Sequence, residues 1–196
     1  MLKSLIFLFL TIHHFSSNAQ RPMTSEDKFA KYTTKFRGIE CKSIDNTTIY
    51  FKFCYAKSYS RTISTLNFGI KTQKKLNSIY LRIVASFRYG NIYREVIDSK
   101  LVNFCQAMNG SSYNLFLKFI FDVIEKSIPG LLHKCPYEGD FDFKNITIDN
   151  QLAMKFSIFP EGQYKYNISI LENSDKVMLM MVIFTEVKSP VKTSFG

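Results

Sequence analysis

The side chains of this sequence that could carry chemistry are four cysteines, four glycosylation sequons and a few titratable groups. The cysteines are Cys41, Cys54, Cys105 and Cys135. They form an even set without a Cys-x-x-Cys spacing or a Cys/His cluster, which favours two disulfides over a zinc or redox site. Three pairings are open. We favour Cys41 with Cys54, across a hairpin. Cys105 with Cys135 would then clamp the base of a helical insert.

Each sequon has the form Asn-x-Ser/Thr with no proline at the central position. The acceptor residues are Asn46, Asn109, Asn145 and Asn167. In the secretory pathway such sites accept a bulky glycan that must face water. The four sequons therefore predict a secreted glycoprotein in which these asparagines lie on exposed faces.

The sequence gives only weak evidence for a catalytic site. His133 is the last of three histidines and the one that lies outside the N-terminal segment. A serine triad would need it as its base, and the sequence has no Gly-x-Ser-x-Gly elbow. Asp140, Asp142 and Asp149 are close in sequence, but on a strand they form a solvated edge as readily as an acid pair. We expect a protein that is not an enzyme, with no catalytic residue, metal or cofactor. A loop position with satisfied hydrogen bonds is the expected role of His133.

The N-terminal segment has the features of a signal peptide over residues 1–19. Lys3 precedes an apolar run at residues 5–12, and the small residues Ser17 and Ala19 precede the expected cut before Gln20. The run is shorter than the roughly 20 residues that cross a bilayer, although a retained signal anchor is the alternative. No other segment is typical of a transmembrane helix, so we expect an extracellular protein.

The remaining 177 residues, 196 minus 19, suit one domain. We place it at residues 33–188, between a flexible N-terminal segment at 20–32 and a flexible tail at 189–196. The formal charge of +10 becomes +9 when Lys3 is removed. This charge is scattered, which suits solubility or an anionic partner, and without a dense basic block we expect no nucleic-acid binding.

Alternation of apolar and polar residues predicts antiparallel strands with one buried face. The clearest segments are residues 49–55, 79–89, 154–158, 163–170 and 177–187, and weaker ones are 34–44, 62–71 and 93–102. Between residues 141 and 148 the apolar positions change phase near Lys144 and Asn145, which predicts a β-bulge. About nine strands in a chain of this length indicate an all-β sandwich of two sheets.

One segment changes to helical periodicity. Residues 113–128 predict an amphipathic helix that Ser111 or Ser112 caps and Pro129-Gly130 ends. Its polar side carries both signs of charge, so we expect a lid packed on the sheets; a helix on a membrane surface is the alternative.

Several of these segments, in this order, resemble a known family. They are Cys41-Lys42-Ser43, residues 50–54, Cys105, Cys135-Pro136-Tyr137, residues 144–147 and residues 159–164. The sequence resembles a large family of secreted insect proteins classed as a domain of unknown function. It departs from that family at Gln106-Ala107-Met108. The family is similar to chemosensory B-type proteins and, more distantly, to the ML lipid-recognition superfamily of the Niemann-Pick type C carrier and the ganglioside activator.

That resemblance implies an ML-like, immunoglobulin-like β-sandwich that holds an apolar ligand, with no catalytic residues. It also implies a role in extracellular transport or chemosensory signalling. From the alternating faces of the strands, the expected ligand-binding residues are Phe51, Phe53, Leu81, Ile83, Tyr164, Tyr166 and Ile168. Phe116 and Ile120 on the helix are expected to bind the ligand as a movable lid. The expected partner is a lipid or other hydrophobic small molecule, bound by a monomer. The same aromatic stripes also fit a filled core, and the alternative is then a secreted interaction module that binds an extracellular protein or receptor.

Overall fold

The computed structural model describes residues 33–109, 115–128, 130–148 and 160–188. All of them belong to one compact unit, Lys31–Gly196. Several predictions lie outside the described residues: the signal peptide at 1–19, the flexible segment at 20–32, the strand at 154–158 and the tail at 189–196. Ser111, Ser112 and Pro129, which were expected to bound the helix, also lie outside them.

Within these ranges the chain forms nine strands and two helices. In chain order they are β1 (Thr33–Ser43), β2 (Ile49–Ser58), β3 (Ser64–Thr72), β4 (Ile79–Tyr89), β5 (Ile92–Asp98), β6 (Val102–Asn103), α3 (Phe104–Met108), α4 (Leu115–Ser127), β7 (Asp140–Ile146), β8 (Gly162–Glu172) and β9 (Lys176–Lys188). The strands match the alternating segments closely because period-two patterning fixes which face of each strand meets the core.

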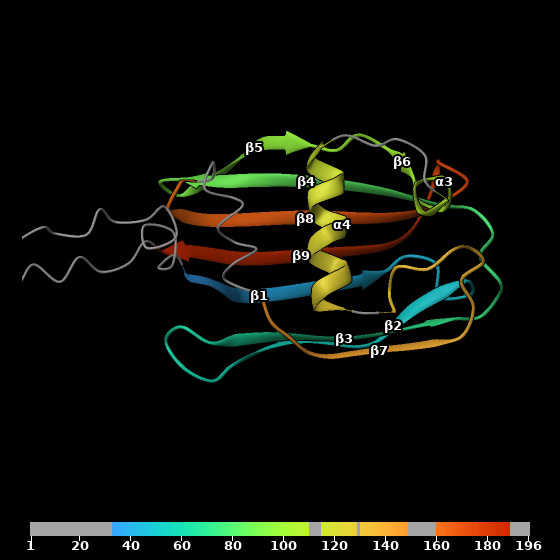
Figure 1. Ribbon diagram of the computed structural model, residues 1–196, viewed down its shortest axis with the longest axis horizontal. Helices are drawn as coiled ribbons and strands as arrows, with labels where there is room; N and C mark the ends of the chain where they lie inside the picture. The colour runs from blue at the N-terminus through green and yellow to red at the C-terminus, as the bar shows by residue number, and fades with distance from the viewer. Residues whose placement is uncertain (1–32, 110–114, 129, 149–159, 189–196) are drawn as a thin grey trace, which may run out of the picture. The chain divides into compact units, whose positions relative to one another are not determined.

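The strands form two sheets, shown in Figure 1. The larger sheet has the order β1-β9-β8-β4-β5, with β6 also paired to β4, and the smaller one has the order β2-β3-β7. Every pairing is antiparallel. The predicted all-β sandwich of about nine antiparallel strands with a helical insert is confirmed.

The first disulfide joins the two sheets. Cys41 on β1 is bonded to Cys54 on β2, the pairing that we favoured. The expected hairpin is wrong, however, because β1 pairs with β9 whereas β2 pairs with β3. The chain crosses from one sheet to the other between these strands, and the backbone N–H of Phe51 donates to the Ser43 hydroxyl at 3.0 Å. The bond therefore ties the sheets together at one edge of the sandwich.

The predicted bulge in β7 is present. Phe143 pairs with Phe68, but Ile146 pairs with Leu66, so three steps along β7 correspond to two along β3. Asn145 absorbs the extra residue with a φ of 56°. Its N–H donates to the Asn67 side chain at 2.9 Å. The change of phase in the sequence thus keeps the apolar side chains inward on both sides of the bulge.

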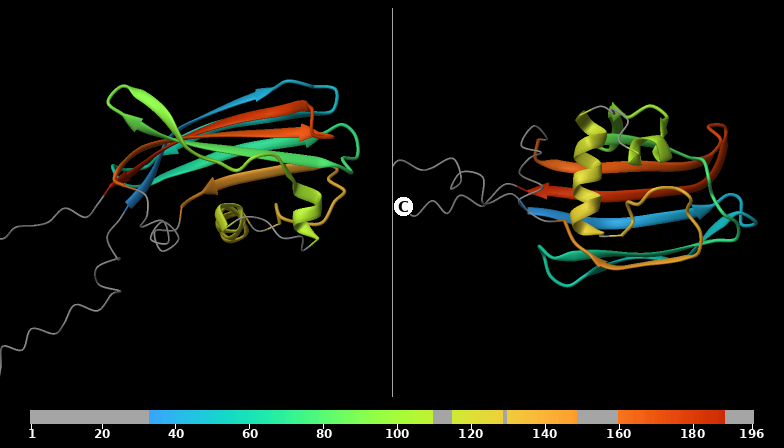
Figure 2. Two further views of the ribbon diagram at one scale, coloured as in Figure 1. Left: turned by 90° about the horizontal axis from the view of Figure 1, so that it is seen from above. Right: turned by 45° about the vertical axis from the view of Figure 1, so that its right-hand side comes forward.

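Helix α4 lies across the large sheet, as Figures 1 and 2 show. Among the helix residues whose burial is described, Leu117 and Phe121 are the most deeply buried. The Phe121 ring packs edge-on against Phe104 of α3, with ring centroids 5.7 Å apart. The amphipathic helix predicted for residues 113–128 is present at Leu115–Ser127, where it packs on the sheets.

Helix α3 was not predicted. Asn103 caps it, because its side-chain oxygen accepts the backbone N–H of Gln106 at 3.0 Å. The second disulfide, Cys105 with Cys135, ties this short helix to the segment that precedes β7. That pairing was predicted, and α4 lies between the two cysteines in sequence.

Candidate ligand-binding cavity

A cavity of about 300 Å³ lies inside the sandwich. Its wall includes residues of β1, β2, β3, β4, β7, β8, β9, α3 and α4. Pockets for small ligands typically measure about 300–1,000 Å³, and an apolar cavity of about 150 Å³ already binds benzene. The cavity is therefore large enough for a small ligand and lies at the lower end of the usual range.

The wall is almost entirely apolar. Its polar members are Thr34, Thr72, Ser127, Tyr137, Thr147, Tyr164, Tyr166 and Thr185. No Lys, Arg, His, Asp or Glu is among the lining residues in the described part of the chain. A charged ligand buried here would lack a counter-ion, which is costly in an apolar environment. The wall thus suits a neutral, hydrophobic molecule.

The large sheet provides one wall through the inward faces of its central strands. Tyr164, Tyr166 and Ile168 alternate along β8, and each lines the cavity. Leu81 and Ile83 do the same on β4. Leu81 pairs with Ile170 and Ile83 with Ile168, so these side chains lie side by side on one face. Regular strands keep the two-residue period, and this period places the predicted side chains together.

Six of the nine residues expected to bind a ligand line the cavity. They are Leu81, Ile83, Ile120, Tyr164, Tyr166 and Ile168. Phe51, Phe53 and Phe116 are absent from the lining. Phe51 pairs with Ile70 and packs, partly buried, against the core.

The placement of Phe53 corrects the sequence-based expectation. The pairing of β2 with β3 shifts between Phe51 and Phe53, so that Phe53 pairs with Gly69. Beyond this bulge the alternation on β2 is reversed: Cys54 pairs with Phe68 and Ala56 with Leu66. Phe68 and Leu66 line the cavity, so the small residues of β2 face inward and Phe53 faces outward.

Phe116 was expected to line the cavity, but it lies one helical turn before Ile120, the first residue of α4 that does so. The helix lines the cavity with residues at i, i+3, i+4 and i+7, namely Ile120, Val123, Ile124 and Ser127. Phe116 is partly buried against the core cluster that includes Leu117 and Phe121. The lid over the cavity is therefore the middle and the C-terminal end of the helix.

Several lining residues were missed. Phe141, Phe143 and Ile146 come from β7, and Met181 and Ile183 come from β9. Their signal was present, because both segments were predicted as strands with apolar faces. What the sequence did not indicate is which strands of the two sheets face each other across the cavity.

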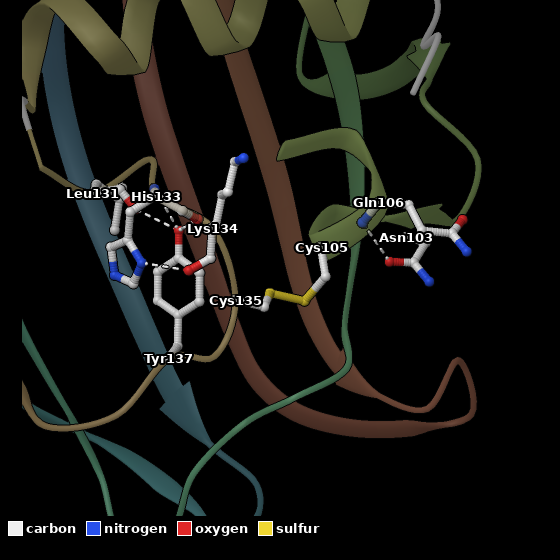
Figure 3. The surroundings of a disulfide bond; sticks show 8 residues. All are labelled: Asn103, Cys105, Gln106, Leu131, His133, Lys134, Cys135 and Tyr137. Atoms are coloured by element: carbon white, nitrogen blue, oxygen red, sulfur yellow. Dashed lines mark hydrogen bonds between the residues drawn. A yellow bond between two sulfur atoms is a disulfide. The ribbon is translucent and has the colours of Figure 1, made fainter. Parts of the chain in front are cut away.

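The second disulfide and Tyr137 hold the loop that follows α4, as Figure 3 shows. The Tyr137 hydroxyl lies 2.7 Å from the Leu131 carbonyl oxygen and 2.8 Å from that of His133, and it accepts the N–H of His133 at 2.9 Å. Burial raises the pKa of this phenol. Tyr137 lines the cavity as well, so one side chain joins the wall to the loop that anchors the lid.

The catalytic candidates of the sequence lie outside the cavity lining. The His133 ring stacks on Tyr137 with centroids 3.9 Å apart, and its Nδ1 lies 2.8 Å from the Lys134 carbonyl oxygen. Asp140 and Asp142 both form ion pairs with Lys52. These hydrogen-bonded and ion-paired carboxylates raise the pKa of Lys52, Asp140 contributing most. Asp149 lies outside the described residues.

The sequon asparagines also lie away from the cavity lining. Asn46, Asn109 and Asn145 are exposed. Asn167 is half-buried on β8, between the cavity-lining Tyr166 and Ile168, and therefore on the opposite face of the sheet. Glycosylation at these four positions remains a prediction. Neither described helix has the length and apolar character that a membrane span requires.

Fold and cavity together define the class: a disulfide-linked antiparallel β-sandwich with an apolar interior cavity under a helical lid. Residues 81–166 match the model of a family described as "Protein of unknown function (DUF1091)". This match, which runs from β4 into β8, confirms the resemblance to a domain-of-unknown-function family that the sequence indicated.

Among solved structures, the chain is similar to a Niemann-Pick type C2 protein from Japanese carpenter ant. The similarity covers 80% of this chain and 93% of that chain, with 10% sequence identity and a TM-score of 0.30. No curated protein is significantly similar to the sequence.

Proposed function

We propose that this protein is a secreted glycoprotein that binds a lipid or other hydrophobic small molecule between its two sheets. The observation that carries the proposal is the uncharged, apolar wall of the 300 Å³ cavity. A filled core of the same residues would leave no such volume, because protein interiors pack nearly as densely as organic crystals. This favours a carrier over the alternative of an interaction module with a filled core.

The binding energy would come from burial of apolar surface, at about 25 cal/mol for each Å² removed from water. Among the described residues of the wall there is no Lys, Arg, His, Asp or Glu. The proposed function is uptake and release of a ligand.

Ligand entry would take place at the helical lid. Helix α4 covers the cavity with Ile120, Val123 and Ile124, whereas strands β4, β8 and β9 are paired to one another by backbone hydrogen bonds. The disulfide between Cys105 and Cys135 limits how far the segment that contains α4 can move. A short outward shift of the helix would open the cavity without breaking either sheet.

Secretion is supported by the two disulfides, which persist in oxidising compartments. A role in extracellular transport or chemosensory signalling rests on the resemblance to the family alone.

The test is the binding of a neutral fluorescent probe, N-phenylnaphthylamine, to the protein secreted from eukaryotic cells. We expect saturable binding to the wild type and its loss in Ile168→Phe, because the larger ring would occupy the cavity that Ile168 lines. Leu171→Met, a buried change on the same strand outside the cavity lining, is the control and should bind as the wild type does. Absence of saturable binding to the wild type would overturn the proposal.

A further inference from the structure

One end of the cavity carries hydroxyl groups that lack partners. The Oγ1 atoms of Thr34 and Thr185 are both buried and have no hydrogen-bond partner among the described residues. Both residues line the cavity, and Thr185 is only 3% exposed. Buried polar groups in folded proteins are almost always hydrogen-bonded, so two unpaired hydroxyls in one wall require an explanation.

The two threonines lie on neighbouring strands. Thr34 of β1 pairs with Val187, and Thr185 of β9 pairs with Phe36, so the two threonines are diagonal neighbours on one face of the sheet. On the other side of β9, Thr185 lies opposite Tyr164 of β8. The hydroxyls therefore form one group at one end of the cavity. At this end β1 and β8 begin and β9, which lies between them, ends (Figure 1).

The tyrosines at this end differ in their bonding. Tyr164 donates its hydroxyl proton to the Pro160 carbonyl oxygen at 2.6 Å. Burial raises the pKa of Tyr166 to about 12, and a side-chain contact with the Thr185 hydroxyl, which falls short of hydrogen-bond geometry, partly offsets this rise. Tyr166 is thus a neutral phenol at physiological pH. No positive charge is among the lining residues to hold an anion here, within the described chain.

We propose that Thr34 and Thr185 form a subsite that hydrogen-bonds an uncharged polar head group, such as a hydroxyl or carbonyl, of an otherwise apolar ligand. The ligand chain would fill the apolar part of the cavity between Ile168, Ile183 and Ile124. Its head group would supply the partners that the two threonine hydroxyls lack. This inference rests on the proposed function, and it names the class of ligand: a neutral amphipathic lipid, not a pure hydrocarbon or a carboxylate.

The chain offers a matched control. Thr72 also lines the cavity, but its hydroxyl is already paired: it accepts the N–H of Gly139 at 2.7 Å and lies 3.2 Å from the Gly139 carbonyl oxygen. Thr→Val removes a hydroxyl with little change of shape at each position. At Thr185 the change removes an unpaired group, whereas at Thr72 it removes a paired one.

The experiment measures displacement of N-phenylnaphthylamine by decanol and by undecane, which have the same number of heavy atoms. Each ligand is titrated against the wild type, Thr185→Val, Thr34→Val and Thr72→Val. The cost of taking each ligand out of water is the same for all four proteins. A change in the ratio of the two affinities therefore reports on the cavity wall alone.

We expect the decanol-to-undecane affinity ratio to fall about 5-fold in Thr185→Val, the loss of roughly one neutral hydrogen bond, and to fall similarly in Thr34→Val. The ratio should stay unchanged in Thr72→Val. Thr185→Val should also unfold at an equal or higher denaturant concentration than the wild type, because it removes an unpaired buried hydroxyl, whereas Thr72→Val should unfold at a lower one.

Three results would overturn the inference. If decanol and undecane bind but their ratio is the same in all four proteins, the polar subsite is absent although the cavity binds ligands. If Thr72→Val lowers the ratio as much as Thr185→Val, the effect does not come from the unpaired hydroxyls. If decanoate at neutral pH binds more tightly than decanol, the head group is an anion. Failure of every ligand to displace the probe would instead count against the proposed function and the subsite together.

Discussion

The ring of Phe53 lies directly over Gly69, its partner across strands β2 and β3, on the face of the small sheet that is turned away from the cavity. A Cβ atom at position 69 would come within 2.5 Å of that ring. The ammonium groups of Lys52 and Lys144 lie 6.0 and 5.6 Å from the centre of the same ring. Phe53, which the alternation of β2 predicted to face the cavity, is thus part of the outer surface.

The outward position of Phe53 predicts that it takes no part in ligand uptake. We expect Phe53→Leu to bind N-phenylnaphthylamine with wild-type affinity. Phe143→Leu makes the same change on β7, where the ring lines the cavity, and it should alter the affinity several-fold. Titration of both variants under the same conditions checks this. A loss of binding in Phe53→Leu alone would contradict the assigned faces of β2.

Stability measurements can distinguish an empty cavity from a filled core. We expect Ile168→Phe to cost less than about 1 kcal/mol in the free energy of unfolding, because the added atoms enter existing space. Leu179→Phe is the control: Leu179 is fully buried and absent from the cavity lining, so overpacking there should cost about 1–3 kcal/mol. Urea unfolding of the two variants gives both numbers. Equal costs for the two changes would indicate that the core at Ile168 is filled.

The two disulfides should have different effects on ligand release. Their sequence separations are 13 residues for Cys41–Cys54 and 30 for Cys105–Cys135. Loop entropy alone then predicts that replacement of either pair by serine costs about 3–4 kcal/mol. Only the second bond restrains the segment that carries α4, so we expect Cys105→Ser/Cys135→Ser to accelerate probe dissociation several-fold. Stopped-flow dissociation tests this, and an equal acceleration in Cys41→Ser/Cys54→Ser would argue against a lid at α4.

The lowered pKa of Asp98 predicts how the free energy of unfolding changes in acid. Arg82 holds Asp98 with two hydrogen bonds of 3.0 and 3.2 Å, and Lys100 lies 2.9 Å away. The hydrogen bonds from Arg82, followed by those from Lys100, hold the pKa of Asp98 well below its ordinary range. As the pH falls below the unfolded-state pKa of about 3.9, the unfolded chain takes up the proton first, so this contribution is lost in acid and is fully present above that pH.

The measurement is urea unfolding of the wild type and Asp98→Asn at a series of pH values. We expect a stability difference that stays constant from about pH 5 to pH 8 and shrinks as the pH falls below about 4. Asp45, whose pKa is lowered chiefly by the hydrogen bond from Lys176, is unchanged in both proteins, so the comparison isolates Asp98. A difference that grows in acid would contradict the assignment.

The sequence predicted the face of a strand wherever the strand is regular or where a bulge leaves apolar residues inward on both sides. On β8 the period of two holds, and Tyr164, Tyr166 and Ile168 all line the cavity. On β7 the phase change around Asn145 was visible because Phe143 and Ile146 both remain inward. In these strands hydrophobicity and burial agree, so the pattern alone was sufficient.

Strand β2 is the opposite case. Its bulge turns Cys54 and Ala56 inward, while Phe53 and Tyr55 face outward. The larger aromatic residues lie on the outer face, where Lys52 and Lys144 lie near the Phe53 ring, so hydrophobicity indicated the wrong face. The cavity itself could not be predicted, because a filled core and a hollow one use the same alternation of apolar residues, and only the spacing of the sheets and of α4 distinguishes them.

The most direct test of the central claim is native mass spectrometry of the secreted protein after glycan removal, followed by organic extraction. A binding cavity predicts a reproducible additional mass of small-lipid size that is lost in Ile168→Phe and recovered in the extract. A protein that keeps its ligand-free mass after incubation with a mixed lipid extract would contradict the claim and would favour an interaction module with a filled core.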